Sequence, residues 1–188
     1  MGTAKGERRR AELVAAAAAL LREGGFDAVR HRAVAQRAGL PLASTTYYFA
    51  SLDELVTAAV ERTSRDDLAC GRAVLAGGAE LDRAQAVEHV LDQLLGVESR
   101  HGGLDAVLLR FERLVGAGRR PYLAPLMREL RVEFEKLLAE ILARAGLRRD
   151  ADAVRALVAV VDGTVVSALI EADPDPRAAA REVLLRSL

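Results

Sequence analysis

Apolar side chains recur at intervals of three and four residues along almost the whole chain, and this periodicity constrains the fold more than any other feature. In the segment 5–23, for example, Leu13, Ala17 and Leu21 fall on one face of a helix. The 188 residues contain only five prolines, and the first of them is Pro41. We therefore predict an all-α fold of about nine helices without long strands.

Glycine and proline mark the ends of two short helices near the N-terminus. The pair Gly24-Gly25 should stop the first helix, and Gly39 should end a second helix over residues 30–38. A third helix is expected over residues 42–49, directly after the break at Pro41. Two short helices separated by three residues are typical of a helix-turn-helix.

The remaining helices are longer. Ser51 and Glu54 form a capping-box pattern, in which the serine hydroxyl and the glutamate carboxylate accept from free amides at the start of a helix that runs to about residue 76. Further helical stripes follow at residues 87–94, 104–115, 126–141, 154–169 and 177–188. No internal repeat or low-complexity linker separates them.

The charge is unevenly distributed, although the formal net charge is zero. Residues 1–50 hold eight Lys/Arg and four Asp/Glu, a net charge of +4, which residues 51–188 balance with −4. The basic residues Lys5 and Arg8 to Arg10 have two interpretations of equal weight: an ordinary solvated tail, or a surface that binds a polyanion. The neighbouring motif favours the second interpretation.

Several function classes lack support in the sequence. The one cysteine, Cys70, excludes an internal disulfide, and the three histidines do not pair at helical metal-ligand spacing, so we predict no metal and no cofactor. No nucleophile elbow or phosphate-binding glycine loop occurs, so we predict no catalytic residues and a protein that is not an enzyme. No apolar run approaches the ~18 residues of a membrane span, and we expect a cytoplasmic protein. A helical-bundle enzyme or carrier is the alternative.

The chemistry of the motif suits a nucleic-acid surface. In a helix-turn-helix, the second helix enters the major groove with its N-terminal residues toward the base edges. Gly39 tolerates the positive φ of the turn. Hydroxyl groups are dense in the third helix, at Ser44, Thr45, Thr46, Tyr47 and Tyr48. Because neighbouring residues on a helix cannot share a face, at least one tyrosine should face outward, and we favour Tyr47; Thr45 could pack inward or contact a base.

The stretch Val34-Ala35-Gln36-Arg37-Ala38-Gly39-Leu40-Pro41 resembles the DNA-binding domain of the TetR family, as do Tyr47-Tyr48-Phe49-Ala50-Ser51 and Asp53-Glu54-Leu55. The resemblance covers residues 7–60. It implies an all-helical homodimer, with three N-terminal helices for DNA and a larger C-terminal bundle for ligand binding and dimerisation. It also implies a phosphate contact for the Tyr47 hydroxyl and a packing role for Phe49 beneath the third helix.

Some positions depart from the family pattern. Pro41, Leu42 and Ala43 replace residues that are commonly small or polar, and Leu52 replaces a common lysine, so base preference does not carry over. Phosphate contacts should shift toward Arg8 to Arg10, Arg30, Arg32 and Arg37. The candidate DNA-binding residues are Arg30, Arg32, Leu42, Ala43, Ser44, Thr46, Tyr47 and Tyr48.

Taken with the resemblance, the sequence predicts a DNA-binding domain at residues 1–50 and an effector-binding and dimerisation domain at residues 51–188. The expected protein is a repressor that binds double-stranded DNA at a palindromic operator and is released by a small-molecule effector. Helices 154–169 and 177–188 are the expected dimer interface, with Val161 and Val165 as positions to test. Asp162 could contact a ligand, a partner subunit or solvent. The candidate ligand-binding residues are Leu91, Leu108, Phe111, Met127, Phe134 and Val158.

Overall fold

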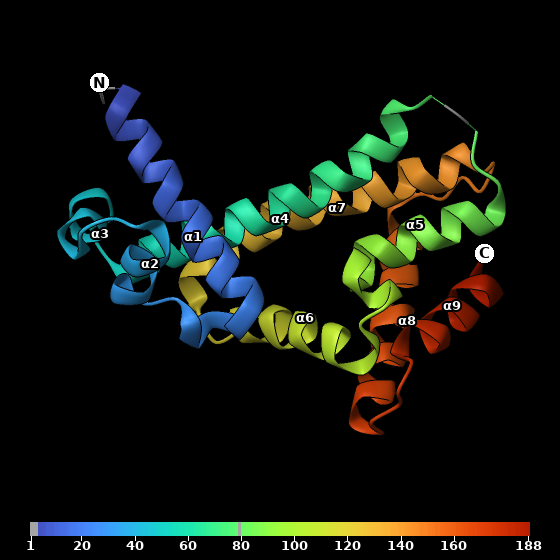
Figure 1. The fold of residues 1–188 in the computed structure, drawn as a ribbon. Helices are drawn as coiled ribbons and strands as arrows, with labels where there is room; N and C mark the ends of the chain where they lie inside the picture. Colours follow the sequence, from blue (N-terminus) through green and yellow to red (C-terminus); the bar gives the residue numbers. More distant parts are fainter. Residues whose placement is uncertain (1–3, 79) are drawn as a thin grey trace. The chain divides into compact units, whose positions relative to one another are not determined.

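The computed structural model describes residues 4–78 and 80–188, and within those ranges helices joined by turns and short loops occur without any strand (Figure 1). This confirms the predicted all-α fold. The α-helices are α1 (Ala4–Ala28), α2 (His31–Ala38), α3 (Leu42–Tyr48), α4 (Leu52–Ala76), α5 (Arg83–Leu95), α6 (Gly103–Ala117), α7 (Ala124–Arg144), α8 (Ala151–Ile170) and α9 (Pro176–Ser187). Two short 3₁₀ helices, η1 (Val97–Arg100) and η2 (Pro121–Leu123), precede α6 and α7; the sequence pattern did not predict them.

The chain divides into two compact units. The first contains the residues up to Asp66 together with Glu112–Met127, and the second contains Asp67–Phe111 and Arg128–Leu188. The division falls within α4, α6 and α7, so each of these helices has residues in both units. The boundary predicted at residue 50 lies inside the first unit and stays a prediction about function.

The first unit is built around the N-terminal helices. α1 packs on α2, and α2 packs on α3. The predicted stop at Gly24-Gly25 appears as a break within α1, where Gly25 has a φ of 65° and a ψ of −162°. The buried apolar residues of this unit are Leu13, Ala16, Ala17, Leu21, Val29, Val34, Phe49, Leu55, Val56, Ala59, Val60, Ala117 and Leu123.

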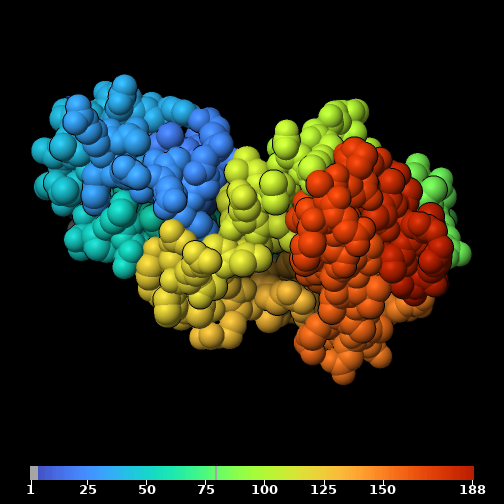
Figure 2. Space-filling model, turned by 90° about the horizontal axis from the view of Figure 1, so that it is seen from below, coloured from blue at the N-terminus to red at the C-terminus, as the bar shows by residue number. Residues whose placement is uncertain are grey.

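In the second unit, α9 packs against both α8 and α5. Figure 2 shows α8 and α9, orange to red, side by side at the surface. α5 begins with a complete capping box, because Asp82 accepts from the Gln85 N–H while the Gln85 side chain accepts from the Asp82 N–H. At the start of α9, the Asp175 side chain accepts from Ala178, and Pro176 occupies the first turn. Local caps thus define where α5 and α9 begin.

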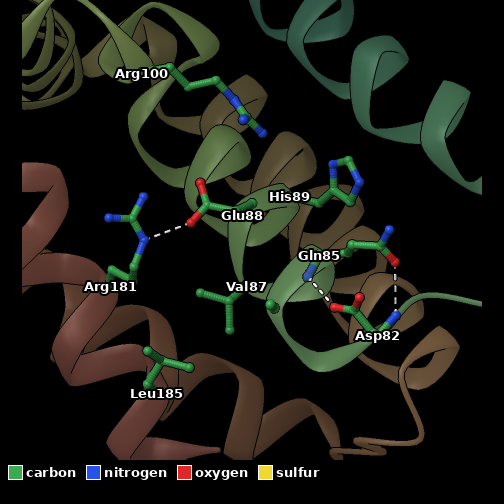
Figure 3. Close-up of a pocket in the computed structure, with 9 residues that line it drawn as sticks. Asp82, Gln85, Val87, Glu88, His89, Arg100, Arg181 and Leu185 are labelled. Atoms are coloured by element: carbon green, nitrogen blue, oxygen red, sulfur yellow. Dashed lines mark hydrogen bonds and ion pairs between the residues drawn. The ribbon is translucent and has the colours of Figure 1, made fainter.

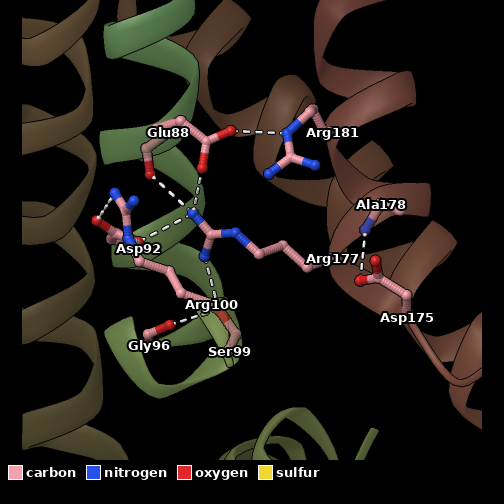
Figure 4. Close-up of polar contacts among 9 residues, drawn as sticks. All are labelled: Glu88, Asp92, Gly96, Ser99, Arg100, Asp175, Arg177, Ala178 and Arg181. Carbon is pink, nitrogen blue, oxygen red and sulfur yellow. Dashed lines mark hydrogen bonds and ion pairs between the residues drawn. The ribbon is translucent and has the colours of Figure 1, made fainter. Parts of the chain in front are cut away.

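A buried arginine joins α9 to α5 and η1 (Figure 4). Arg177 is only 4% exposed, and it donates to the Ser99 hydroxyl at 2.6 Å, the Glu88 carboxylate at 2.8 Å and the Asp92 carboxylate at 2.9 Å. Arg181 binds the other Glu88 oxygen at 2.6 Å, and Arg100 binds Asp92. We call these five charged residues the Arg177 cluster.

The two arginines that bind Glu88 change its titration. The hydrogen bond from Arg181 has the largest effect and that from Arg177 adds to it, and together they lower the pKa of Glu88 to about 2 against the opposing effect of burial. Glu88 is therefore ionised throughout the physiological pH range. The Arg177 cluster holds α9 on α5 through charge-assisted hydrogen bonds.

Candidate nucleic-acid interface

The turn between α2 and α3 depends on one glycine. Gly39 has a φ of 64° and a ψ of 28°, the left-handed conformation that side chains disfavour. Its N–H donates to the carbonyl of Gln36, and the N–H of Leu40 donates to that of Ala35, so the open carbonyls at the end of α2 are satisfied. Pro41 then fixes an extended backbone before α3. The turn sets the direction in which α3 leaves α2.

Two residues hold α3 on the core of the first unit. Thr45 is fully buried, and its hydroxyl donates to the Leu42 carbonyl at 2.8 Å. Of the two alternatives for this residue, the structure supports inward packing. Phe49, just past the end of the helix, is 1% exposed and belongs to the core, with the Arg10 guanidinium 5.0 Å from its ring centroid. Phe49 packs at the end of α3, as the resemblance implied.

The opposite face of α3 is open to solvent. Tyr47 is 80% exposed and Leu42 is 52% exposed, and Ala43 and Thr46 are exposed beside them. The expectation that Tyr47 faces outward is confirmed. Tyr48 is half-buried, and its ring meets that of Tyr47 edge to face, with 4.9 Å between the centroids. Contact with the core therefore restricts how far the Tyr48 side chain can reach into solvent. The Tyr47 hydroxyl stays free to contact an external group.

The candidate basic residues differ in the contacts that their side chains make within the protein. Arg32 is exposed, and no polar contact of its side chain occurs within the described residues. Arg30 is exposed as well, but its Nε donates to the Asp27 carbonyl at 3.0 Å, which fixes the direction of the side chain. Of the two, Arg32 is the freer to reach a phosphate.

Arg37 is engaged by an acid that sequence reasoning did not assign to it. Both terminal nitrogens of Arg37 donate to the Glu23 carboxylate, at 2.8 and 2.5 Å. The hydrogen bond from Arg37 lowers the pKa of Glu23, and the pairing raises the pKa of Arg37. The pair ties α2 to the end of α1, so Arg37 is less available to phosphate than the sequence suggested.

α4 begins beside α3, and its cap follows most of the predicted pattern. The Glu54 N–H donates to the Ser51 hydroxyl at 3.1 Å, as a capping box requires. The Glu54 carboxylate accepts from the N–H of Ala50, at 2.8 Å, rather than from that of Ser51. The chain between Phe49 and α4 is thus held by two hydrogen bonds, which fixes the exit of α3.

The candidate ligand-binding residues do not all belong to one unit. Leu91, Phe111 and Val158 are buried in the second unit, where Phe134 is half-buried and Leu108 is 38% exposed. Met127 packs against the core of the first unit. None of the six lines the groove of about 530 Å³ that opens between α5 and α9 (Figure 3).

That groove is lined by Asp82, Ala84, Gln85, Val87, Glu88, His89, Arg100, Arg181 and Leu185. Most of its polar groups already have partners: Asp82 pairs with Gln85, Glu88 with Arg181, and Arg100 with Asp92. The groove is an open surface hollow whose charges are internally neutralised. It offers a ligand few polar groups that lack a partner within the protein.

Asp162 lies midway along α8 and is partly buried. Burial raises the pKa of its carboxyl, and this outweighs the opposing effect of the nearby cations Arg131 and Arg110. Both arginines have carboxylate partners of their own: Arg131 binds Glu135 at 2.6 Å and Arg110 binds Asp67 at 2.9 Å. Asp162 is therefore a carboxylate whose charge is poorly compensated.

Comparison with known proteins identifies the family. Residues 13–59 match the model of the tetR family of bacterial regulatory proteins, and residues 81–188 match that of the tetracyclin repressor-like C-terminal domain. The chain is 27% identical, over 90% of its length and 87% of the relative's, to the nicotine-responsive transcriptional repressor HdnoR of Paenarthrobacter nicotinovorans.

Solved structures agree with this assignment. The multidrug binding protein EbrR complexed with proflavin is 35% identical, with a TM-score of 0.68 over 96% of this chain and 99% of that one. The ethidium complex of EbrR is 34% identical, with a TM-score of 0.70 over 96% of this chain and 98% of that one. With the two family models and the N-terminal motif, these matches show that the chain belongs to the TetR family of bacterial transcription regulators.

Proposed function

We propose that the protein is a sequence-specific repressor that binds a palindromic operator as a homodimer and leaves it when a small-molecule effector binds. The observation that carries this proposal is the two-sided character of α3. Thr45 and Phe49 anchor the helix in the core, whereas Leu42 and Tyr47 stand in solvent. A short helix that is held rigidly and exposes its outer face after a glycine turn has the geometry of a major-groove reading helix.

Phosphate contacts would come from side chains around α3. The exposed hydroxyl of Tyr47 can donate to a phosphate oxygen, and Arg32 and Arg30 supply positive charge from α2 and the residue before it. Arg37 contributes less, because Glu23 neutralises it. These contacts fix the position of the protein on DNA and make its affinity depend on salt.

Dimerisation is supported by the outer face of α8. Ile170 is 79% exposed, Val160 47% and Val166 41%, an apolar row on one side of the helix. Val161 and Val165, the positions favoured by the sequence, are fully buried within the subunit. The interface we propose is therefore the opposite, solvent-facing side of the same helix. A two-fold dimer would place its reading helices about 34–36 Å apart, in successive major grooves.

The composition of α8 fits this interface. Charged residues interrupt α8, so it holds no long uninterrupted apolar run, but Ala151–Ile170 as a whole is long and apolar enough to cross a membrane by length and composition alone. Of its apolar window, 33% is buried in the subunit. Such a helix is also expected where a second subunit covers the remaining apolar surface. We assign the uncovered face to the dimer and the protein to the cytoplasm.

We further propose that the effector is a planar organic cation bound in the second unit. Support comes from the similarity to EbrR, solved with proflavin and with ethidium, which are both aromatic cations. Asp162 offers a partly buried negative charge that such a ligand would neutralise. The apolar candidates of that unit, Leu91, Leu108, Phe111, Phe134 and Val158, would supply contacts to aromatic rings. Met127 packs in the core of the first unit and is not part of the proposed site. An effector that prefers the form unable to bind DNA would weaken operator affinity by about 1–3 kcal/mol.

The test is selection of duplexes from a random library, followed by titration of the selected operator with ethidium and proflavin. We expect an inverted repeat to be enriched, two subunits to bind it, and the cations to release it. Because both dyes bind DNA themselves, ligand binding is first measured by calorimetry without DNA. The proposal would be abandoned if no duplex were enriched over the input library.

A further inference from the structure

The composition of α3 restricts how it can read DNA. Its seven residues are Leu42, Ala43, Ser44, Thr45, Thr46, Tyr47 and Tyr48. The set contains no Arg, Lys, Asn or Gln, the side chains that make paired hydrogen bonds to guanine or adenine. The usual strong polar recognition of purines is therefore absent from this helix.

The hydroxyl groups of α3 do not replace those contacts. Thr45 is buried, and the Thr46 hydroxyl donates to the Ala43 carbonyl at 3.2 Å. Ser44 is half-buried. Tyr47 lies in the second turn of the helix, and we have assigned its hydroxyl to a phosphate. Few polar atoms of the first turn remain for base edges.

Apolar surface is what the first turn presents instead. Leu42 is 52% exposed, and Ala43 is exposed next to it. Both precede the anchored Thr45, in the part of a reading helix that lies nearest to the bases. A base pair presents only one apolar group to the major groove, the C5-methyl of thymine. Contact between this methyl and the leucine side chain removes apolar surface of both partners from water.

We propose that Leu42 and Ala43 recognise thymine methyl groups, so that thymines opposite the first turn of α3 determine operator preference. This inference rests on the proposed DNA-binding function and assigns its specificity. Recognition of this kind depends on shape and burial, and it discriminates thymine from cytosine and from uracil. Phosphate contacts by Tyr47 and Arg32 would hold the helix at the depth where the methyl meets Leu42.

The experiment replaces each thymine of the selected operator, one position at a time, with deoxyuridine. This substitution removes the methyl group and leaves base pairing and the hydrogen-bonding edge unchanged. We expect one or two positions in each half-site to lose affinity about four-fold, the factor expected for one buried methyl-sized group. Replacement in both half-sites should lower affinity about sixteen-fold, since separated contacts are nearly additive. Fluorescence anisotropy at fixed salt measures both.

A double-mutant cycle then assigns the methyl to its partner. In Leu42→Ala, the affinity for the thymine operator should fall, and the penalty for deoxyuridine at the sensitive position should shrink to less than about two-fold. The matched control is Leu114→Ala in α6, a leucine of comparable exposure at 45%, which should keep the full deoxyuridine penalty. Circular dichroism confirms that both variants are folded.

Three results would overturn the inference. Equal affinity for every deoxyuridine operator would show that no methyl is read, and a selected operator without thymine in its half-sites would do the same. A deoxyuridine penalty that persists unchanged in Leu42→Ala at every sensitive position would show that Leu42 does not contact a thymine methyl. In all three cases operator binding itself would remain established, whereas failure to select any duplex would instead remove the proposed function.

Discussion

In the first unit, the candidate DNA-binding side chains lie close together in sequence, from Arg30 to Tyr48, and all except the half-buried Ser44 and Tyr48 are exposed. In the second unit, Arg177 is only 4% exposed, and the side chains that it contacts lie 78 to 89 residues away in the sequence. The first arrangement leaves polar groups free for an external partner, and the second uses them within the fold. Substitutions in the two places should therefore affect different properties: DNA affinity in the first unit, and stability or assembly in the second.

The largest effect is expected at the Arg177 cluster. Arg177→Met removes four charge-assisted hydrogen bonds, to the Ser99 hydroxyl, the Glu88 carbonyl and the carboxylates of Glu88 and Asp92. The two carboxylates then have fewer partners in a partly buried place, which should cost about 3–5 kcal/mol of unfolding free energy. Chemical denaturation measures this. The ion pairs of Glu88 stabilise the fold only while its carboxyl is ionised. Because Glu88 has a pKa of about 2 in the folded protein, this contribution to the unfolding free energy is fully present above the ordinary carboxyl pKa, near 4.5. It should disappear as the pH falls from about 4.5 to about 2. A loss below about 1 kcal/mol would contradict a structural role for the cluster.

The proposed dimer face should respond next most strongly. Val160→Lys places a charge in the apolar row of α8 and should weaken association on the order of 100-fold, without unfolding the subunit. Sedimentation at several protein concentrations would detect the monomer. Val115→Lys in α6 is the matched control, since this valine is 68% exposed and lies in another helix. Dimers that persist in Val160→Lys at micromolar concentration would place the interface elsewhere.

Removing the hydroxyl group of Tyr47 tests its proposed contact with a DNA phosphate. Tyr47→Phe should lower operator affinity about ten-fold, because a hydrogen bond to a charged phosphate is lost, and should leave the melting temperature unchanged. Tyr122→Phe is the control, a tyrosine in η2 whose pKa is raised by burial and by Asp53. Unchanged affinity in Tyr47→Phe would mean that the exposed hydroxyl is not a phosphate contact.

A smaller loss of stability is expected at the turn. In Gly39→Ala the added Cβ would meet no atom within 4 Å, so the cost comes only from the positive φ, about 1 kcal/mol. Thermal unfolding measures it. Gly77→Ala, where φ is not positive and an added Cβ would lie an ordinary 3.6 Å from the Val74 carbonyl oxygen, should be close to neutral. Equal effects at the two glycines would argue against the role of Gly39 in the turn.

The smallest change in stability is expected at Asp162, and it has the opposite sign. Since burial raises the pKa of Asp162 in the folded protein, its ionisation costs stability as the pH rises above the ordinary aspartate range. Asp162→Asn should therefore raise the melting temperature slightly at pH 7, and less at pH 4. Calorimetric titration should show weaker ethidium binding to the same variant. A lower melting temperature at pH 7 would show that the carboxylate has a favourable partner.

Sequence reasoning succeeded where the determining interactions are local. The ends of α4, the position of the turn and the outward direction of Tyr47 follow from residues only a few positions apart. The Ser51 hydroxyl accepts from the Glu54 N–H at the start of α4, as predicted, and Gly39 has a positive φ. Periodicity also identified the helices of the second unit, because their apolar stripes are regular.

Long-range pairing was not predictable in this way. Nothing near Arg177 in the sequence indicates that it is buried, because its partners come from another helix and from η1. Glu23 and Arg37 are fourteen residues apart and meet only because α2 folds back on α1. The burial of Val161 and exposure of Val160 likewise depend on which side of α8 faces α9, which a helix rich in valine on all sides does not reveal.

The most direct test of the central claim compares the affinity of the protein for the selected operator with its affinity for a scrambled duplex of the same composition, by anisotropy at physiological salt. A sequence-specific regulator should prefer the operator by at least about 1,000-fold, and both affinities should fall as salt rises. Equal affinities for the two duplexes would contradict the account, because they would show that α3 does not read sequence.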